Sequence, residues 1–146
     1  MKVFAALAVL AVTLFAGETP ARHSHYLHAL SDLRYARFLL NHPKELSDGA
    51  QKEATAHIDR AITEIKRASI DDHKGLNDHP PADRSWDRAS RLRRVTELLQ
   101  SAMRDLNYDD DEYRALNWRN AAIQNVRDAL DLTRKTIASQ SPVHHY

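Results

Sequence analysis

The chain of 146 residues contains no cysteine, so its stability must come from packing, and haem attachment through C-x-x-C-H is excluded. It contains three glycines, too few to build a loop that cradles phosphate groups. No serine lies in a G-x-S-x-G turn. The sequence suggests neither a nucleophile with its base nor a pair of catalytic acids. We therefore expect a protein that is not an enzyme.

An excess of either charge is also missing. Lysine and arginine number 21, aspartate and glutamate 20, and the formal net charge is +1. The arginines at 88, 91, 93 and 94 alternate with apolar positions, which indicates a solvated helix face. Nucleic acid is therefore not expected as a partner. A protein partner remains open, and its identity cannot be predicted.

The only long hydrophobic run lies near the N-terminus, at Val3–Phe15. It is shorter than the roughly 20 residues that a membrane-spanning helix needs. Small residues follow it, and Thr19 and Ala21 suit the positions before a cleavage site, so we predict a signal peptide at residues 1–21. Cleavage after Ala16 and an uncleaved anchor are the alternatives. We expect residues 22–146 to be periplasmic or secreted, with no membrane span after signal removal.

Two helical hairpins of similar sequence make up the rest of the chain. AHIDRAITEIKR, starting at Ala56, is echoed by QNVRDALDLTRK, starting at Gln124. Each hairpin has an apolar stripe that it cannot bury alone, so two of them predict an all-α four-helix bundle. The stripes follow a 3-4-3-4 spacing. They consist of Tyr26, Ala29, Leu33, Ala36 and Leu40; Ala54, Ile58, Ala61, Ile65 and Ala68; Leu92, Val95, Leu99, Ala102 and Leu106; and Leu116, Ala122, Val126, Ala129, Leu130, Thr133 and Ile137.

Local signals set the ends of these helices. The first is predicted from about Ser24 to Asn41. The second is predicted from Ser47 or Asp48, with Asp48 and Gln51 at capping-box spacing, up to a long polar loop at 71–86. The third begins near Trp86 or Asp87, and the fourth begins in the acidic run that follows a turn at 107–110. The first and last connections are short, which favours antiparallel neighbours. The sequence therefore predicts an up-down-up-down order.

This order would gather seven of the nine histidines at one end of the bundle: His23, His25, His28, His73, His79, His144 and His145. Imidazole with carboxylate is a ligand set suited to zinc, copper or nickel. The candidate metal ligands are His25, His28, His73, Asp71 and Asp72. The alternative interpretation is that these histidines are ordinary surface and capping residues. We expect His57 to form a hydrogen bond with Asp32 rather than to act in catalysis.

HYLHALSDLRYARFLL, from His25, and IDRAITEIKRASIDDHKGLNDHPP, from Ile58, resemble a group of small exported bacterial helical-bundle proteins with no assigned activity. The resemblance covers about the first half of the expected mature chain. It implies an exported helical domain and nothing about a substrate. The function we expect is a structural or interaction role in the cell envelope, and the alternative is weak binding or buffering of a transition metal at the histidine-rich end.

Overall fold

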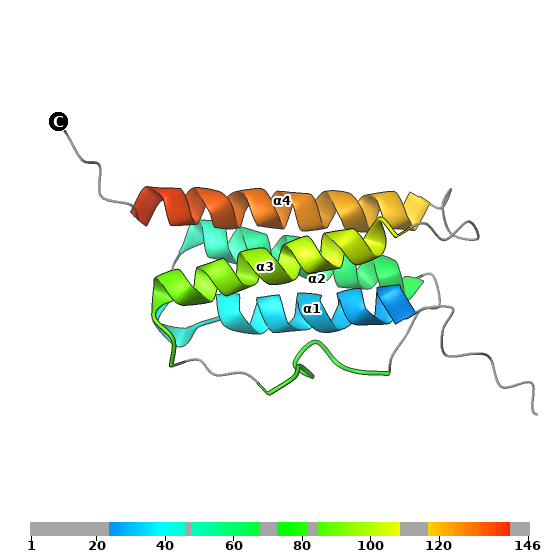
Figure 1. The fold of residues 1–146 in the computed structure, drawn as a ribbon, viewed down its shortest axis with the longest axis horizontal. Coiled ribbons are helices and arrows are strands. Elements are labelled where there is room, and N and C mark those ends of the chain that lie inside the picture. Colours follow the sequence, from blue (N-terminus) through cyan, green and yellow to red (C-terminus); the bar gives the residue numbers. More distant parts are fainter. Residues whose placement is uncertain (1–23, 46–47, 68–72, 82–84, 109–116, 141–146) are drawn as a thin grey trace, which may run out of the picture.

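The computed structural model describes residues 24–45, 48–67, 73–81, 85–108 and 117–140. Its helices are α1 (Ser24–Leu40), the short 3₁₀-helix η2 (Pro43–Glu45), α2 (Gly49–Arg67), α3 (Arg88–Leu106) and α4 (Asn117–Gln140). The predicted all-α four-helix bundle is confirmed (Figure 1). The predicted signal peptide at 1–21 and the predicted start of the last helix lie outside the described residues. None of the described helices is long and apolar enough to cross a membrane.

The predicted apolar stripes form the core. Every stripe position of the first and third helices is buried, and Leu30, Leu39, Ile62 and Leu98 extend the cluster. In α4 the stripe changes near its end, where Thr136 is buried and Ile137 is only partly covered. Ala68 of the second predicted stripe and Leu116 of the fourth lie outside the described residues. The helices therefore form where the spacing of apolar residues offers a continuous face to bury.

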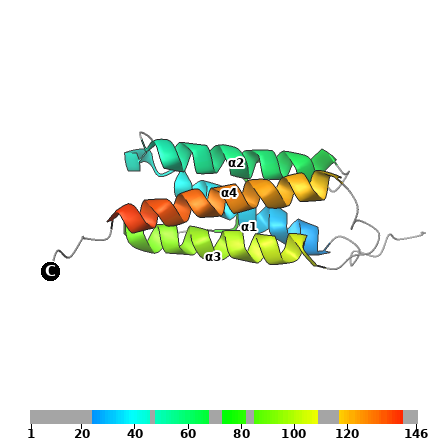
Figure 2. The same cartoon turned by 90° about the horizontal axis from the view of Figure 1, so that it is seen from above.

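The order of the helices differs from the up-down-up-down prediction, which is wrong in the direction of α3. His25 at the start of α1 bonds to Asp105 at the end of α3, so these two helices are antiparallel. Arg88 at the start of α3 bonds to Gln51 at the start of α2, so these two are parallel. The bundle is therefore up-down-down-up (Figures 1 and 2). Around the bundle, α1 packs on α2 and α3, and α4 packs on the same two helices.

The connection between α2 and α3 explains this reversal. Its described segment 73–81 runs along the outside of α1 (Figure 1). Arg34 donates to the carbonyl of Lys74 at 3.4 Å, and further along α1 the ring of Phe38 lies 3.8 Å from that of His79. The chain thus returns along α1 before α3 begins. Connections that cross the length of a bundle in this way allow parallel successive helices.

We call the two ends of the bundle the Asp105 end, where α1 and α4 begin, and the Glu45 end, where α2 and α3 begin. At the Glu45 end, Asp48 caps α2 by accepting a hydrogen bond from the amide of Gln51 at 3.0 Å, as its spacing predicts. This hydrogen bond, with the hydrogen bond and the charge of Arg88, lowers the pKa of Asp48 against the opposing effect of partial burial. Asp87 caps α3 in the same way through the amide of Ser90.

Replacing Asp48 with alanine should destabilise the bundle by about 1 kcal/mol, because an amide at the start of α2 loses its acceptor. Asp48→Asn keeps a capping oxygen and should lose less than the alanine variant. The measurement is the free energy of unfolding in guanidinium chloride. Equal losses in the two variants would show that the charge pair with Arg88 matters rather than the cap.

Candidate functional site

Among the described residues, the predicted metal ligands do not meet as one group. His25 and His28 lie together on α1, where both hydrogen-bond to Asp105. His73 is exposed in the connecting segment, and the next residue, Lys74, is bonded to α1 and α2 through its carbonyl. Asp71 and Asp72 lie outside the described residues. The sequence therefore identified two of the residues that come together and missed Asp105, which the wrong direction of α3 would have placed at the opposite end.

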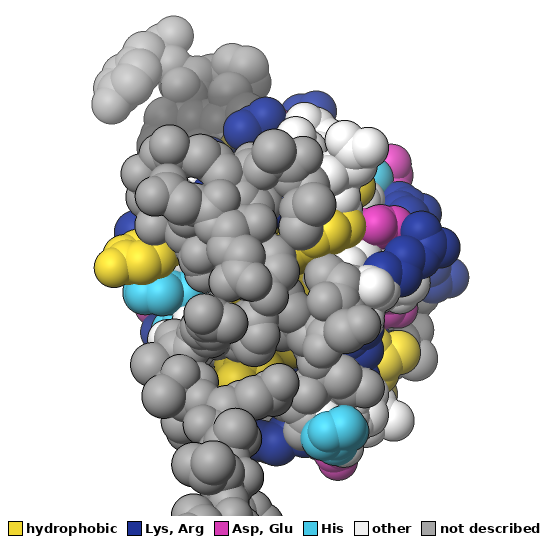
Figure 3. All heavy atoms as spheres, turned by 90° about the vertical axis from the view of Figure 1, so that its right-hand side faces the viewer, with side chains coloured by type: hydrophobic (Ala, Val, Ile, Leu, Met, Phe, Trp, Pro, Cys, Tyr) yellow, Lys and Arg dark blue, Asp and Glu magenta, His cyan; other side chains and the backbone are white. Residues whose placement is uncertain are grey.

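Of the seven histidines predicted to gather at one end of the bundle, His23, His144 and His145 lie outside the described residues. Helix α4 ends at the Glu45 end, whereas the predicted order would have placed its end beside the start of α1 (Figures 1 and 2). His79 lies against Phe38 near the end of α1. Figure 3 looks onto the Asp105 end, and the histidine side chains that it shows are at separate places. The prediction of a histidine-rich end was derived from the up-down-up-down order, so it loses its basis in the observed order.

The two carboxylate oxygens of Asp105 each accept a hydrogen bond from one histidine. The Nδ1 atoms of His25 and His28 lie 3.1 Å and 2.5 Å from them. The hydrogen bond to Asp105 raises the pKa of His28 above its ordinary value of 6.5, against the opposing effect of partial burial. The ring of His25 also stacks on Tyr108, with centroids 3.6 Å apart. Residues far apart in the sequence thus join the start of α1 to the end of α3.

His57 has a different partner from the one predicted. Its Nδ1 atom lies 2.9 Å from the side-chain oxygen of Asn125 on α4, instead of bonding to Asp32. This difference also follows from the arrangement of the helices, because α2 packs closely on α4. Asp32 points toward α3, where it accepts a hydrogen bond from Ser101.

A second polar cluster lies at the Glu45 end. Arg91 donates to Glu45, and Gln51 donates to the same carboxylate at 3.0 Å. Arg88 donates to Asp48 at 2.6 Å and to Gln51 at 2.9 Å. The side chain of Arg91 is only 5% exposed, so the expectation that these arginines form a solvated face is wrong for Arg91. This network joins η2 and α2 to α3.

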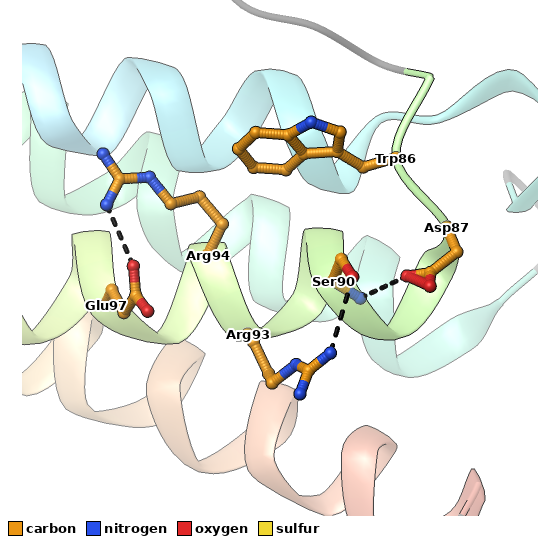
Figure 4. A pocket seen from close by; sticks show the side chains of 6 residues that line it. All are labelled: Trp86, Asp87, Ser90, Arg93, Arg94 and Glu97. Carbon is orange, nitrogen blue, oxygen red and sulfur yellow. Dashed lines mark hydrogen bonds and ion pairs between the residues drawn. The ribbon is translucent and has the colours of Figure 1, made fainter.

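The outer surface of α3 carries an open hollow of about 630 Å³ (Figure 4). It is lined by Trp86, Asp87, Ser90, Arg93, Arg94 and Glu97, a set that we call the Trp86 groove. The indole of Trp86 lies over α3 on the side facing α1, and Arg94 projects on the same side (Figure 4). Trp86 is 40% exposed, which is unusual for so large an apolar side chain.

The charged side chains of the Trp86 groove differ in whether they have a partner of opposite charge. Asp87 is used by the N-terminus of α3, and Glu97 accepts a hydrogen bond from Arg94 at 2.9 Å. Arg93 makes one long hydrogen bond, 3.4 Å, to the hydroxyl of Ser90, and it forms no ion pair with a carboxylate of the described residues. The groove therefore offers an exposed aromatic face beside Arg93, a cation that forms no ion pair in the described part of the chain.

No protein-family model matches the chain, and neither the curated proteins nor the solved structures contain a match. The resemblance to small exported bacterial helical-bundle proteins therefore stays a prediction.

Proposed function

We propose that the chain is an exported, non-enzymatic helical-bundle protein that binds a protein partner of the cell envelope through the Trp86 groove. The observation that supports this proposal is the exposed indole of Trp86 beside Arg93 and Arg94. Tryptophan and arginine are the residue types that most often dominate the binding energy of protein interfaces. The Trp86 groove is therefore the surface through which we expect the interaction role to be carried out.

The charge of the groove defines the chemistry of the partner. Because Asp87 and Glu97 already have partners and Arg93 has no carboxylate partner among the described residues, an incoming acidic side chain would find a cation. An apolar side chain next to it would cover the indole of Trp86. We therefore expect the partner to present an acidic residue beside an apolar one. The packed core beneath the groove holds α3 fixed, so little ordering is needed on binding.

A photoreactive amino acid in place of Ser90, which lines the groove and leaves Trp86 and Arg93 in place, should cross-link one specific protein in the envelope fraction of the native host. The same replacement at Arg134, which is exposed on α4, is the matched control and should give no such product. Adding Trp86→Ala should abolish the product while the far-ultraviolet circular dichroism stays unchanged. Cross-linking at both positions, or a product that survives Trp86→Ala, would contradict the proposal.

Direct binding can then be measured with the purified partner, because the chain has only two tryptophans. Trp118→Phe leaves Trp86 as the only fluorophore of this kind. Covering its indole should shift the emission to shorter wavelength. A partner that leaves the emission unchanged does not bind in the groove.

A further inference from the structure

Three side chains from α1 and α3 converge at the Asp105 end. His28 and Asp32 lie one turn apart on α1, and Asp105 faces them from α3. Each offers one ligand atom, and these atoms all lie within 4.8 Å of one another. The group brings together two helices that pack along their length, so the packing of the bundle positions it.

One carboxylate oxygen of this group, on Asp32, lacks a hydrogen-bond donor. Its Oδ2 atom is buried and finds no hydrogen-bond donor among the described residues. Burial raises the pKa of Asp32, against the hydrogen bond from Ser101. A buried acceptor without a partner is costly, and the Nδ1 atom of His28 lies 3.5 Å from this oxygen. A cation placed between them would satisfy this oxygen.

We propose that His28, Asp32 and Asp105 bind a divalent first-row transition metal ion, with zinc as the best match. One imidazole nitrogen and two carboxylate oxygens form a mixed set that suits zinc, whereas calcium requires six to eight oxygen ligands. Three protein ligands leave further positions for water. The site differs from the predicted set, since it contains Asp32 and Asp105 in place of His73, Asp71 and Asp72.

The distances require only a small adjustment. Ligand atoms about 2.1 Å from a tetrahedral zinc ion are roughly 3.4 Å apart. The separation between His28 and Asp32 is already 3.5 Å, and that between His28 and Asp105 must widen from 2.5 Å. The side chain of His28 is 58% exposed and can turn to allow this, while both aspartates are held by the helices. Zinc would replace the proton that His28 now donates to Asp105.

The surroundings of the site also suit an ion. The exposed side chain of His28 leaves a path from solvent, and Asp32 and Asp105 lie deeper, with 13% and 16% of their side chains exposed. His25 hydrogen-bonds to the second oxygen of Asp105 at 3.1 Å. Such a bond orients a carboxylate that binds metal through its other oxygen. His25 is therefore a positioning residue rather than a ligand.

The test is calorimetric titration of zinc chloride into the full chain, made without a polyhistidine tag. We expect one zinc ion per chain, and a loss of at least about tenfold in affinity for Asp32→Asn and for Asp105→Asn. Asp32→Asn removes a buried charge and should fold normally. His28→Gln, at an exposed position, supplies a third variant if Asp105→Asn does not fold.

Two matched controls separate this site from the other histidines. His57→Gln changes a partly buried histidine that lies 3.9 Å from Asp128, and it should leave the zinc affinity unchanged. Replacement of both His144 and His145 with alanine should do the same. Absence of binding at millimolar zinc, or full affinity in Asp32→Asn and His28→Gln, would overturn the proposal. Trp86→Ala, at the other end of α3, should not affect zinc, so failure of the partner proposal and failure of this one are distinguishable.

Discussion

Glu45→Gln should lower the free energy of unfolding by about 3 kcal/mol at neutral pH, because it leaves the guanidinium of Arg91 buried without its counter-charge. The side chains of Glu45 and Arg91 are 13% and 5% exposed. Burial alone would raise the pKa of Glu45, but hydrogen bonds from Gln51 and Arg91 and the charges of Arg91 and Arg88 outweigh it and lower the pKa. The ionised carboxylate therefore stabilises the native state.

The same argument sets the pH dependence. Because the pKa of Glu45 is lowered on folding, its contribution to stability is present above the ordinary value of 4.5 and is lost as the pH falls through the folded value. The difference in unfolding free energy between Glu45→Gln and the unchanged chain should thus be largest near neutral pH. It should shrink steadily as the pH falls below about 4.5. Denaturant unfolding at a series of pH values measures it.

The exposed pair of Arg94 and Glu97 provides the matched control. Glu97→Gln is the same chemical change at a side chain that is 62% exposed, and it should change stability by less than about 0.5 kcal/mol. The double variant Glu45→Gln with Arg91→Met should be more stable than Glu45→Gln alone, since no unpaired charge remains buried. If Glu45→Gln were as mild as Glu97→Gln, the buried network would not hold α3 against η2.

Leu99→Ala should cost about 3 to 4 kcal/mol, because it opens a cavity in a close-packed core. Leu99 on α3 is 0% exposed and belongs to the central cluster. A loss of this size is a large part of the 5 to 15 kcal/mol that stabilises a typical domain, so the midpoint of guanidinium unfolding should fall markedly.

Leu132→Ala on α4 makes the same change at a partly buried position on the edge of the core. It should cost roughly half as much or less, because the remaining space is open to solvent. Similar losses for the two variants would show that the bundle does not pack around Leu99 as described.

The spacing of apolar residues correctly predicted the buried side chains of the described helices, except near the end of α4, where Thr136 is buried and Ile137 is only partly covered. Leu33 and Leu99 are both predicted stripe positions, and both are fully buried. Asp48 caps α2 at the predicted spacing. These features depend on short-range geometry: the helical repeat and the first unpaired amides of a helix are properties of neighbouring residues.

The candidate site was harder to predict. The three-residue spacing of His25 and His28 placed both on one face of α1, and the structure keeps them together. Nothing in the sequence linked them to Asp105, and Asp32 was expected to pair with His57. The exposure of Trp86 had no local signal either, since an aromatic residue before a helix can pack inward or outward.

By itself, the sequence determined that four amphipathic helices would bury their stripes in one bundle, because each stripe exposes apolar area that only another helix can cover. Only the tertiary structure decided the direction of α3. Both directions bury the same stripe, and a long connection allows either, so the choice depends on contacts such as those of segment 73–81 with α1 and of Arg91 with Glu45. That choice places Asp105 beside His28 and Asp32, and it separates them from the Trp86 groove.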